Sequence, residues 1–440
     1  MNMSKKIIKV LTSVAFALLS VLPSMAQDGA AGAYSPYSVF GIGDLYRQGN
    51  AYGKTMGGTG IAGRDRRYIN LLNPASVTAR DTLSVMFDMG LYLDNRVFKQ
   101  NDLRSVNNTF NINNFSVSFP IKGKTAMMFS LSPYSNVGYD YSYSMNDPVL
   151  ITQTRYVNYN ATGTGSIYQL SGAIGTQLFK RLSIGVEGIY YFGNIDKDCI
   201  MSTASTSHRS LQNGYTLQLN ALAGKIGVQY EQPVGGLNMT IGATYKTSTR
   251  LKGYVTDYKY ASISGLVDTL YHKVDTLSKG PGVKMAGEIG VGVSIRKSDR
   301  WSAEINYTYS DWTGSGMGTY TGFANNGKSN FSTTYSQNLR AGFEIIPNRN
   351  DIRYYMRTCS YRGGLYYERA YYKLDGNTVN SYGITLGMTF PVFRFYNGIT
   401  VGMDLGQRGS TRGNMTKENY IRFSLGINIH DLWFIKPRYE

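Results

Sequence analysis

From about residue 82 onward, apolar and polar residues alternate one by one in segment after segment. Residues 301–310 place Trp, Ala, Ile, Tyr and Tyr on one face and Ser, Glu, Asn, Thr and Ser on the other. The same alternation runs through 182–190 and 421–430, and through 283–296, where Val283, Met285 and Ile289 begin the apolar face. A period of two puts successive side chains on opposite faces of an extended strand. The pattern therefore predicts a chain built mainly of β-strands.

A soluble sandwich also alternates, and two features favour a membrane barrel. Trp301 and Tyr309 bound the apolar face of one strand, eight residues apart. At ~3.4 Å per residue and a tilt of about 40°, this separation covers roughly 20 Å along the membrane normal, close to the apolar band of a membrane barrel. The polar face carries Gly, Ser, Thr, Glu and Arg, which suits a narrow lumen better than a lysine-rich solvent surface.

Short and long connections alternate between the predicted strands. Short turns occur at 121–124, 179–181, 233–236, 297–300, 347–351 and 394–398. Longer loops lie near 98–110, 144–164, 196–214, 256–281, 313–331, 371–377 and 409–418. Six short and seven long connections join fourteen strands. We therefore expect an all-β fold, a transmembrane antiparallel β-barrel of about 14 strands, whose closure leaves no unpaired edge in hydrocarbon.

The first 26 residues have the composition of a secretory signal peptide. Lys5, Lys6 and Lys9 precede a short apolar run, and the small residues Ser24 and Ala26 mark a cleavage site after Ala26. No run of 18 or more apolar residues follows, so no transmembrane helix is predicted. We expect three parts: a signal peptide over 1–26, an amino-terminal segment over 27–81 and a barrel over 82–440, in the outer membrane.

Charge and cysteine content limit the partners. The formal net charge is +17, which would suit a nucleic-acid partner in a cytosolic protein, but export makes such a partner improbable. The surplus cations can instead face the anionic headgroups of outer-membrane lipids and lipopolysaccharide, or be scattered solvated lysines. Cys199 and Cys359 are the only thiols, so no disulfide framework is expected.

Residues 27–81 show no sustained period and are rich in turn residues. They contain Met56-Gly57-Gly58 with Gly60, and end near the triplet Asn73, Pro74 and Ala75. With the fourteen-strand tally, these residues make the chain resemble the FadL family of outer-membrane transporters for fatty acids and other hydrophobic compounds. The resemblance implies that 27–81 forms a hatch, or plug, inside the barrel, with the triplet in its last turn. On the residues alone, the triplet is a tight turn entering a strand, because Asn-Pro is common in turns.

The third predicted strand is interrupted by a proline. Thr125, Met127, Phe129 and Leu131 form its outward face, and Pro133 follows. Since proline cannot donate to the ladder, the strand must bend or lose a pairing there. Members of the FadL family have a kink in the third strand that opens the wall toward lipid. The resemblance thus implies a lateral opening at Ser132, Pro133, Tyr134, Ser135 and Asn136; the alternative is that Pro133 only begins an extension beyond the membrane.

The inward positions carry charges where the family resemblance implies apolar pockets. Buried charges persist when they are paired, so we expect a salt-bridged network in the bore. It would hold the hatch, or bind a carboxylate headgroup through Arg340, Arg362 or Arg422; alternatively the charges simply fill and hydrate a narrow barrel. The main predicted members are Asp88, Glu288, Glu304, Arg340, Arg362, Asp404 and Arg422, and Glu187, Lys246, Lys284, Glu344 and Arg408 also point inward.

Other chemical signals are weak. The run from Gly58 to Gly63 matches a dinucleotide fingerprint in letters only, because no strand precedes it and no helix follows. His208, His272 and His430 lack metal-ligand spacing. We expect no enzyme activity, no cofactor and no bound metal.

Two functions fit these observations. The first is passive uptake of hydrophobic small molecules such as fatty acids, with the hatch as gate. The second is a non-transporting barrel that serves as a subunit of an outer-membrane secretion or assembly complex, to which the charged bore and the long loop 252–282 are equally suited.

Overall fold

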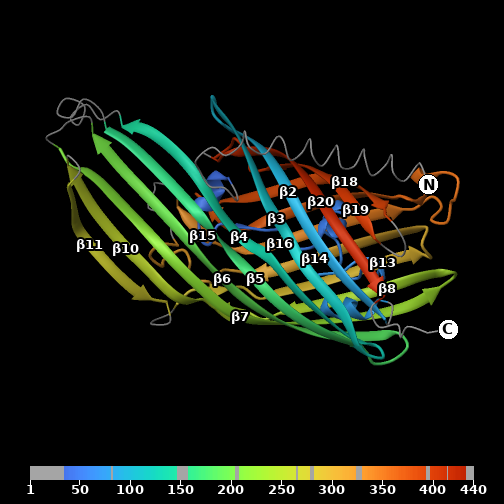
Figure 1. Ribbon diagram of the computed structural model, residues 1–440. Coiled ribbons are helices and arrows are strands. Elements are labelled where there is room, and N and C mark those ends of the chain that lie inside the picture. Colours follow the sequence, from blue (N-terminus) through green and yellow to red (C-terminus); the bar gives the residue numbers. More distant parts are fainter. Residues whose placement is uncertain are drawn as a thin grey trace, which may run out of the picture.

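The computed structural model describes residues 34–80, 83–145, 157–203, 208–263, 266–277, 282–323, 330–392, 397–413 and 415–432. The signal peptide and the boundary near residue 81 lie outside these ranges. Fourteen antiparallel strands form a closed barrel, in which β20 pairs with β2 from Ser84↔Leu432 to Lys99↔Lys417 (Figure 1). The prediction of a barrel of about 14 strands is confirmed.

The wall consists of β2 (Ser84–Gln100), β3 (Leu103–Lys122), β4 (Thr125–Met145), β5 (Val157–Gln177), β6 (Leu182–Thr203), β7 (Ser210–Val234), β8 (Leu237–Lys246), β13 (Glu288–Lys297), β14 (Trp301–Asp311), β16 (Tyr335–Ile345), β17 (Ser360–Leu374), β18 (Asn377–Pro391), β19 (Gly398–Arg408) and β20 (Lys417–Leu432).

Several shorter elements complete the described part of the chain. Before the first wall strand come η2 (Pro36–Val39), β1 (Asp44–Leu45), α2 (Ala51–Thr55) and η3 (Pro74–Thr78). Beyond the barrel wall lie β9 (Thr249–Arg250), β10 (Lys252–Ile263), β11 (Leu266–Thr276), β12 (Lys284–Met285), β15 (Phe331–Thr333) and α4 (Tyr355–Thr358). Among the described residues, no helix has the length and apolar character needed to span a bilayer.

The alternation along the strands matches the two faces of the wall. Ile289, Val291 and Val293 of β13 are about half exposed, whereas Gly290 and Gly292 between them are buried. The aromatic limits of the apolar face continue across neighbouring strands, because Trp301 stacks on Phe343 and Tyr309 on Tyr335. The outward face is thus apolar with aromatic boundaries, as a membrane barrel requires.

The expected start of one apolar face is wrong. Val283 and Met285 precede β13, are buried, and belong to a core of the outer half of the molecule rather than to the lipid-facing surface. Met285 lies in β12, which pairs only with β9 among the described residues. The sequence pattern could not distinguish Val283 and Met285 from lipid-facing residues, because residues of a buried core and residues that face lipid are equally apolar.

Several of the expected connections are also wrong. Residues 98–110 are mostly strand, since β2 and β3 meet in a tight turn at Asn101, and 371–377 are likewise a hairpin that turns at Asp375 and Gly376. Asp375 and Gly376 have φ of 48° and 78°, the left-handed pair typical of an Asp-Gly turn. The expected short turn at 347–351 extends to α4. These segments are polar because they lie beyond the apolar band, where a paired strand can have polar residues on both faces.

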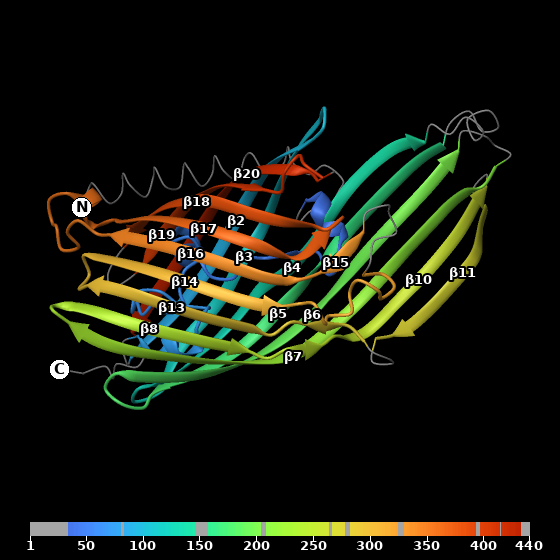
Figure 2. The same cartoon turned by 180° about the vertical axis from the view of Figure 1, so that it is seen from behind.

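Strands β4 to β7 extend past the barrel and form a blade with β10 and β11 (Figures 1 and 2). Strand β7 divides its pairing: residues 225–234 pair with β8, and residues 210–220 pair with β10. The region 256–281, expected to be a loop, therefore contains much of a β-hairpin that widens this blade.

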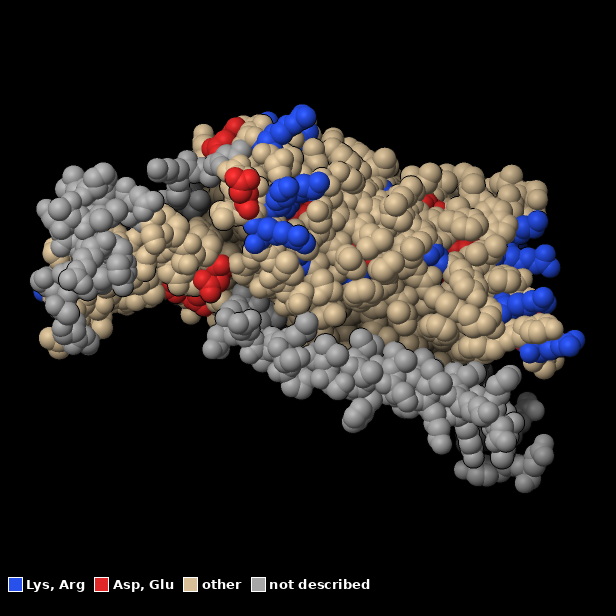
Figure 3. Space-filling view, turned by 90° about the horizontal axis from the view of Figure 1, so that it is seen from above, with Lys and Arg blue, Asp and Glu red and all other residues tan. Residues whose placement is uncertain are grey.

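An apolar core fills the space between the blade and the opposite wall. Tyr37, Phe40 and Ile42 pack there with Leu217 of β7 and Tyr372 of β17. The outer half of the molecule is therefore closed by packed side chains. At the other end, where the short turns lie, Lys and Arg side chains gather, and few charged side chains are visible across the middle of the same face (Figure 3).

Candidate functional site

The barrel wall opens between β3 and β4. Their pairing begins near the short turn at residue 123 and ends at Phe115↔Leu131, although both strands continue toward the outer end. Figure 1 shows the two strands diverging beyond this point. The pairing of β4 with β5 also shifts register between Pro133 and Ser135. We call this opening between β3 and β4 the lateral gap.

A short piece of the amino-terminal segment occupies the free edge of β4. Asp44 and Leu45 of β1 pair with Asn136 and Ser135, and the Tyr46 backbone N–H donates to the Tyr134 carbonyl at 2.8 Å. All five residues from Ser132 to Asn136 thus lie where the wall is interrupted.

Gln48 adds a side-chain link to the same edge. Its amide donates to the Pro133 carbonyl at 3.1 Å, and its carbonyl oxygen accepts from Gln169 at 2.6 Å and from Ser132 at 3.3 Å. Residues 44–48 of the amino-terminal segment therefore contact the proline break in β4. We refer to residues 34–80 as the hatch segment.

The triplet Asn73, Pro74 and Ala75 forms the start of η3 and is completely or almost completely buried. The Asn73 side chain caps the turn by accepting from the Ala75 N–H at 3.0 Å, and donates to the Ile61 carbonyl at 2.7 Å. It also reaches the Val228 carbonyl of β7 at 3.3 Å. The triplet is therefore both a capped turn and a contact between the hatch segment and the wall.

Glycines in the wall make room for this turn. A Cβ at Gly227 would lie 2.0 Å from the Asn73 side-chain oxygen, and one at Gly185 would lie 2.4 Å from the Pro74 carbonyl carbon. Wall residues without side chains thus let the hatch backbone approach β6 and β7 directly.

Three of the predicted lumen charges, Arg340, Asp404 and Arg422, belong to one ion-paired network. Arg422 pairs with Asp404 at 3.7 Å and with Asp94 at 2.9 Å. Arg47 of the hatch segment joins Asp404, at 3.1 Å, to Glu368, which also pairs with Arg340 at 2.9 Å. Two further predicted members have partners outside this network: Glu344 for Arg362 and, at 4.0 Å, Lys246 for Glu288.

Two predicted members are not part of any ion pair in the described structure. Asp88 accepts hydrogen bonds from the side chains of Asn114 and Asn50, and Glu304 accepts from the backbone N–H groups of Ala62 and Gly63. Assigning these two carboxylates to a salt-bridged network was wrong. Both are buried and satisfied by neutral donors, several of which come from the hatch segment, and a strand pattern cannot reveal such donors.

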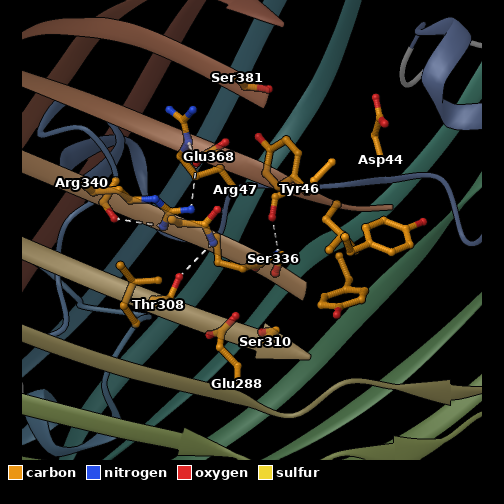
Figure 4. A pocket seen from close by; sticks show the side chains of 18 of the residues that line it. Asp44, Tyr46, Arg47, Glu288, Thr308, Ser310, Ser336, Arg340, Glu368 and Ser381 are labelled. Atoms are coloured by element: carbon orange, nitrogen blue, oxygen red, sulfur yellow. Dashed lines mark hydrogen bonds and ion pairs between the residues drawn. The ribbon is translucent and has the colours of Figure 1, made fainter. Parts of the chain in front are cut away.

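The residues that join hatch and wall were missed. Arg47 contacts Glu368 at 2.9 Å and Asp404 at 3.1 Å, from two different strands (Figure 4). Arg67 bridges Asp65 in its own turn and Glu344 of β16. These cations lie in a segment without periodicity, so no face could be assigned. The one available signal was the charged run 64–67. Arginines in a segment enclosed by the barrel need carboxylate partners, and these must come from the wall.

Burial and pairing set the protonation of the hatch groups. Burial disfavours a charged Asp65, but the guanidinium groups of Arg296 and Arg67 outweigh it and hold the pKa of Asp65 well below its usual range. Burial also disfavours the charged form of Lys54, and the nearby cations Arg422 and Arg47 add to this effect. The pKa of Lys54 therefore lies well below that of a free lysine. The Lys54 ammonium lies against Asn113 and 3.7 Å from the centre of the Tyr46 ring.

A cavity of about 230 Å³ with both polar and apolar lining residues remains inside the barrel between these elements. Its lining combines hatch residues with wall residues on many strands, and Figure 4 shows Arg47, Arg340 and Glu368 projecting into it together with Tyr46. Within the described ranges, no group of three His, Cys, Asp or Glu residues is placed to hold a metal ion. The cavity offers hydrogen bonds and paired charges, and its lining also includes apolar and aromatic side chains such as Ile61, Leu72 and Trp312.

Comparison with known families decides the relationship. The sequence model of the BamG family matches residues 3–440. The chain belongs to the BamG family. BamG is a family within the FadL-like group of outer-membrane barrels, so the resemblance to that group is confirmed.

Solved structures share the fold of this BamG chain at low sequence identity. The toluene transporter TbuX of Ralstonia pickettii has a TM-score of 0.58 at 14% identity, over 86% of this chain and 97% of the other. A FadL homologue of Pseudomonas aeruginosa has a TM-score of 0.59 at 11% identity, over 87% and 98%. The toluene transporter TodX of Pseudomonas putida has a TM-score of 0.56 at 13% identity, over 90% and 100%. No curated protein sequence matches.

Proposed function

We propose that this BamG chain is a FadL-like outer-membrane channel for passive uptake of hydrophobic small molecules, which leave the bore sideways through the lateral gap. The observation that carries the proposal is the end of β3–β4 pairing at Phe115↔Leu131 beside the Pro133 register shift. An apolar molecule released there enters the acyl chains without crossing the polar short-turn end of the barrel. TbuX and TodX are toluene transporters, which supports an apolar cargo.

The hatch segment would act as the gate in this function. Residues 44–48 lie on the free edge of β4, so the gap is occupied in the present conformation. Opening requires that β1 separate from β4, which breaks a two-residue pairing and the hydrogen bonds of Gln48. Asp44 of β1 also forms an ion pair with Arg408 at 2.7 Å, so movement of β1 must break or carry this pair in addition to the neutral contacts with β4.

Uptake of a labelled cargo tests the proposal. Cells that carry this chain as their sole copy would be measured for uptake of radiolabelled toluene and oleate. Pro133→Val, which lets β4 pair regularly, is expected to lower uptake severalfold. Pro120→Val changes the other irregular proline of this hairpin, close to the short turn and away from the gap, and is expected to leave uptake unchanged. Uptake unaffected by Pro133→Val would remove lateral release.

A second candidate is a non-transporting subunit of an outer-membrane secretion or assembly complex. The observation that favours it is the closed interior: the apolar core fills the outer half, and the hatch segment is fastened by Arg47 and Arg67 to carboxylates of the wall. Purification from native membranes separates the two functions, because a stoichiometric complex without measurable uptake favours the subunit and an isolated barrel with uptake favours the channel.

The binding site for a carboxylate headgroup that was expected at Arg340, Arg362 or Arg422 has little support. Each of these guanidinium groups already faces a carboxylate within 4 Å, namely Glu368, Glu344 and Asp94. A ligand carboxylate would have to displace an existing buried ion pair. We therefore propose a neutral or weakly polar cargo for the channel function.

A further inference from the structure

Lys197 of β6 is buried in the outer half of the molecule, where β6 belongs to the blade; its side chain is held by backbone carbonyls. The residue is 8% exposed. Its ammonium group donates to the carbonyls of Val39 at 2.9 Å, Gly41 at 3.2 Å and Gly322 at 3.1 Å. An ammonium group has three N–H donors, so these bonds use its full capacity. Burying a charge without a counter-ion is costly, and a lysine at this position therefore needs these carbonyls.

The three carbonyls come from two segments that are far apart in the sequence. The first two belong to residues 35–43, a part of the hatch segment that we call the strap, and the third belongs to residues 312–323, which we call the outer loop. Gly41 and Gly322 have φ of 58° and 84°, the left-handed region that favours glycine. The Gly41 N–H also donates to the Phe323 carbonyl at 2.9 Å. The strap and the outer loop are thus bonded to each other and, through Lys197, to the blade.

The strap crosses the outer end of the bore. Ser35 donates its N–H to a carbonyl of β4 at 2.8 Å, and Tyr37 donates its hydroxyl to the Thr416 carbonyl beside β20 at 2.5 Å. Tyr371 of β17 donates to the Gly43 carbonyl at 2.9 Å. Strands β4 and β6 lie on one side of the closed barrel, and β17 and β20 lie on the other. A segment with contacts to all four strands must pass over the bore.

The strap and the outer loop separate the cavity of the barrel from the outer surface. Ile42 of the strap and Phe323 of the outer loop are completely buried in the apolar core of the outer half. Trp312, Tyr371 and Tyr372 belong to the same core and also line the cavity. The core is therefore the outer wall of the cavity, and two segments without regular strand pairing supply much of it.

We propose that Lys197 is the tie that keeps the cavity closed to the outside, because its ammonium group holds the strap and the outer loop on the blade. Without this donor, three buried carbonyls lose their partner and regain hydrogen bonds only in water. The two segments should then leave the blade together, since the bond between Gly41 and Phe323 joins them. This inference goes beyond both proposed functions, because it concerns the outer closure of the barrel and depends on neither cargo nor partner.

Hydrogen exchange of the purified full chain in detergent tests the tie. In Lys197→Met, we expect the amides of 37–43 and 316–323 to exchange about tenfold faster than in the wild type, through local opening. The amides of β13 and β14 should keep their protection and thereby report a folded barrel. Lys252→Met removes an exposed ammonium group from β10 of the same blade and should leave both segments at the wild-type rate.

A thiol inside the cavity tests the closure itself. Ser336 lines the cavity and is 8% exposed. In a background with Cys199→Ala and Cys359→Ala, Ser336→Cys would be treated with a permanently charged methanethiosulfonate, which does not dissolve in the detergent layer. We expect the reaction to be about tenfold faster when Lys197→Met is added, because the local opening exposes the cavity to water, and unchanged when Lys252→Met is added.

Each other outcome overturns a named part of the proposal. Wild-type exchange in both segments of Lys197→Met would show that the three bonds do not hold them. Faster exchange in only one segment would contradict their joint release. Faster exchange in both, with an unreactive thiol, would remove the closure. If β13 and β14 lose protection in Lys197→Met, then Lys197→Gln, whose shorter neutral side chain cannot reach all three carbonyls, is measured instead. None of these readouts uses uptake, so they are separate from the test of the channel.

Discussion

Leu45 of the hatch segment pairs with Ser135 of β4 at a height where β3 has already separated from that strand. The edge of β4 is therefore paired locally by a residue of the amino-terminal segment. Under the proposed channel function, the gap opens toward lipid only when β1 leaves the edge of β4.

A disulfide between these two positions should lock the gate. The Cα atoms of antiparallel partners lie about 4.5–5.5 Å apart, which a disulfide can span. In a background with Cys199→Ala and Cys359→Ala, we expect Leu45→Cys with Ser135→Cys to abolish toluene uptake when oxidised and to restore it on reduction. Each single cysteine variant serves as a control. Full uptake by the oxidised double variant would show that cargo does not pass this edge.

Arg47 is expected to hold the hatch segment more firmly than any neutral contact. Arg47→Met removes the contacts with Glu368 and Asp404, which then keep only Arg340 and Arg422. Breaking a buried ion pair leaves an incompletely compensated charge and costs roughly 3 kcal/mol. Amides of residues 44–55 should therefore exchange about a hundredfold faster.

The exposed Arg353→Met provides the control for that measurement. Arg353 lies near α4 at the short-turn end and is exposed. Its removal should change stability by no more than about 0.5 kcal/mol. If Arg47→Met left hatch exchange at the level of this control, the ion pairs would not be what fastens the segment.

Acid should weaken the hatch through Asp65. Because Arg296 and Arg67 hold its pKa well below the ordinary value, its charge stabilises the folded state. That contribution is fully present above the unfolded pKa, about 3.9, and is lost as the pH falls through that value toward the folded pKa. The melting temperatures of the wild type and Asp65→Asn should therefore differ most near pH 7 and converge in acid. A constant difference across this range would exclude the charge of Asp65 as the cause.

The strands that cross the membrane were predictable because lipid and lumen impose opposite chemistry on alternate residues. Phe129 and Leu131 point outward as the period of two requires, and both are about 40% exposed. The same logic failed beyond the bilayer, where both faces of a strand meet water. There the polar residues near Asn107 resembled a loop although they are paired with β2.

The candidate site was only partly accessible from the sequence. Pro133 was found because its missing N–H interrupts any ladder. Arg47 and Gln48 were not, because their contacts depend on how an aperiodic segment folds within the barrel. Glu304 shows the same limit from the wall side: its inward position followed from alternation, but its partners are hatch N–H groups that no strand pattern contains.

Two adjacent glycines of β17 offer a matched test of hatch packing. A Cβ at Gly364 would lie 2.2 Å from the backbone nitrogen of Gly57, whereas a Cβ at Gly363 would meet nothing closer than 3.8 Å. Gly57 has a φ of +73°, so the turn at the hatch is already constrained and has little freedom to move aside. Gly364→Ala should therefore force the turn at 56–58 away from the wall.

The cost of this overpacking is expected to be about 1–3 kcal/mol, visible as faster exchange of the amides in 53–60. Gly363→Ala adds the same methyl group to the same strand but on the opposite face, and should leave the hatch unchanged. The comparison isolates contact with the hatch from any general effect of alanine in a strand. Equal exchange in the two variants would mean that the hatch turn does not rest on β17 in the membrane, and that the plug occupies the barrel in a different position.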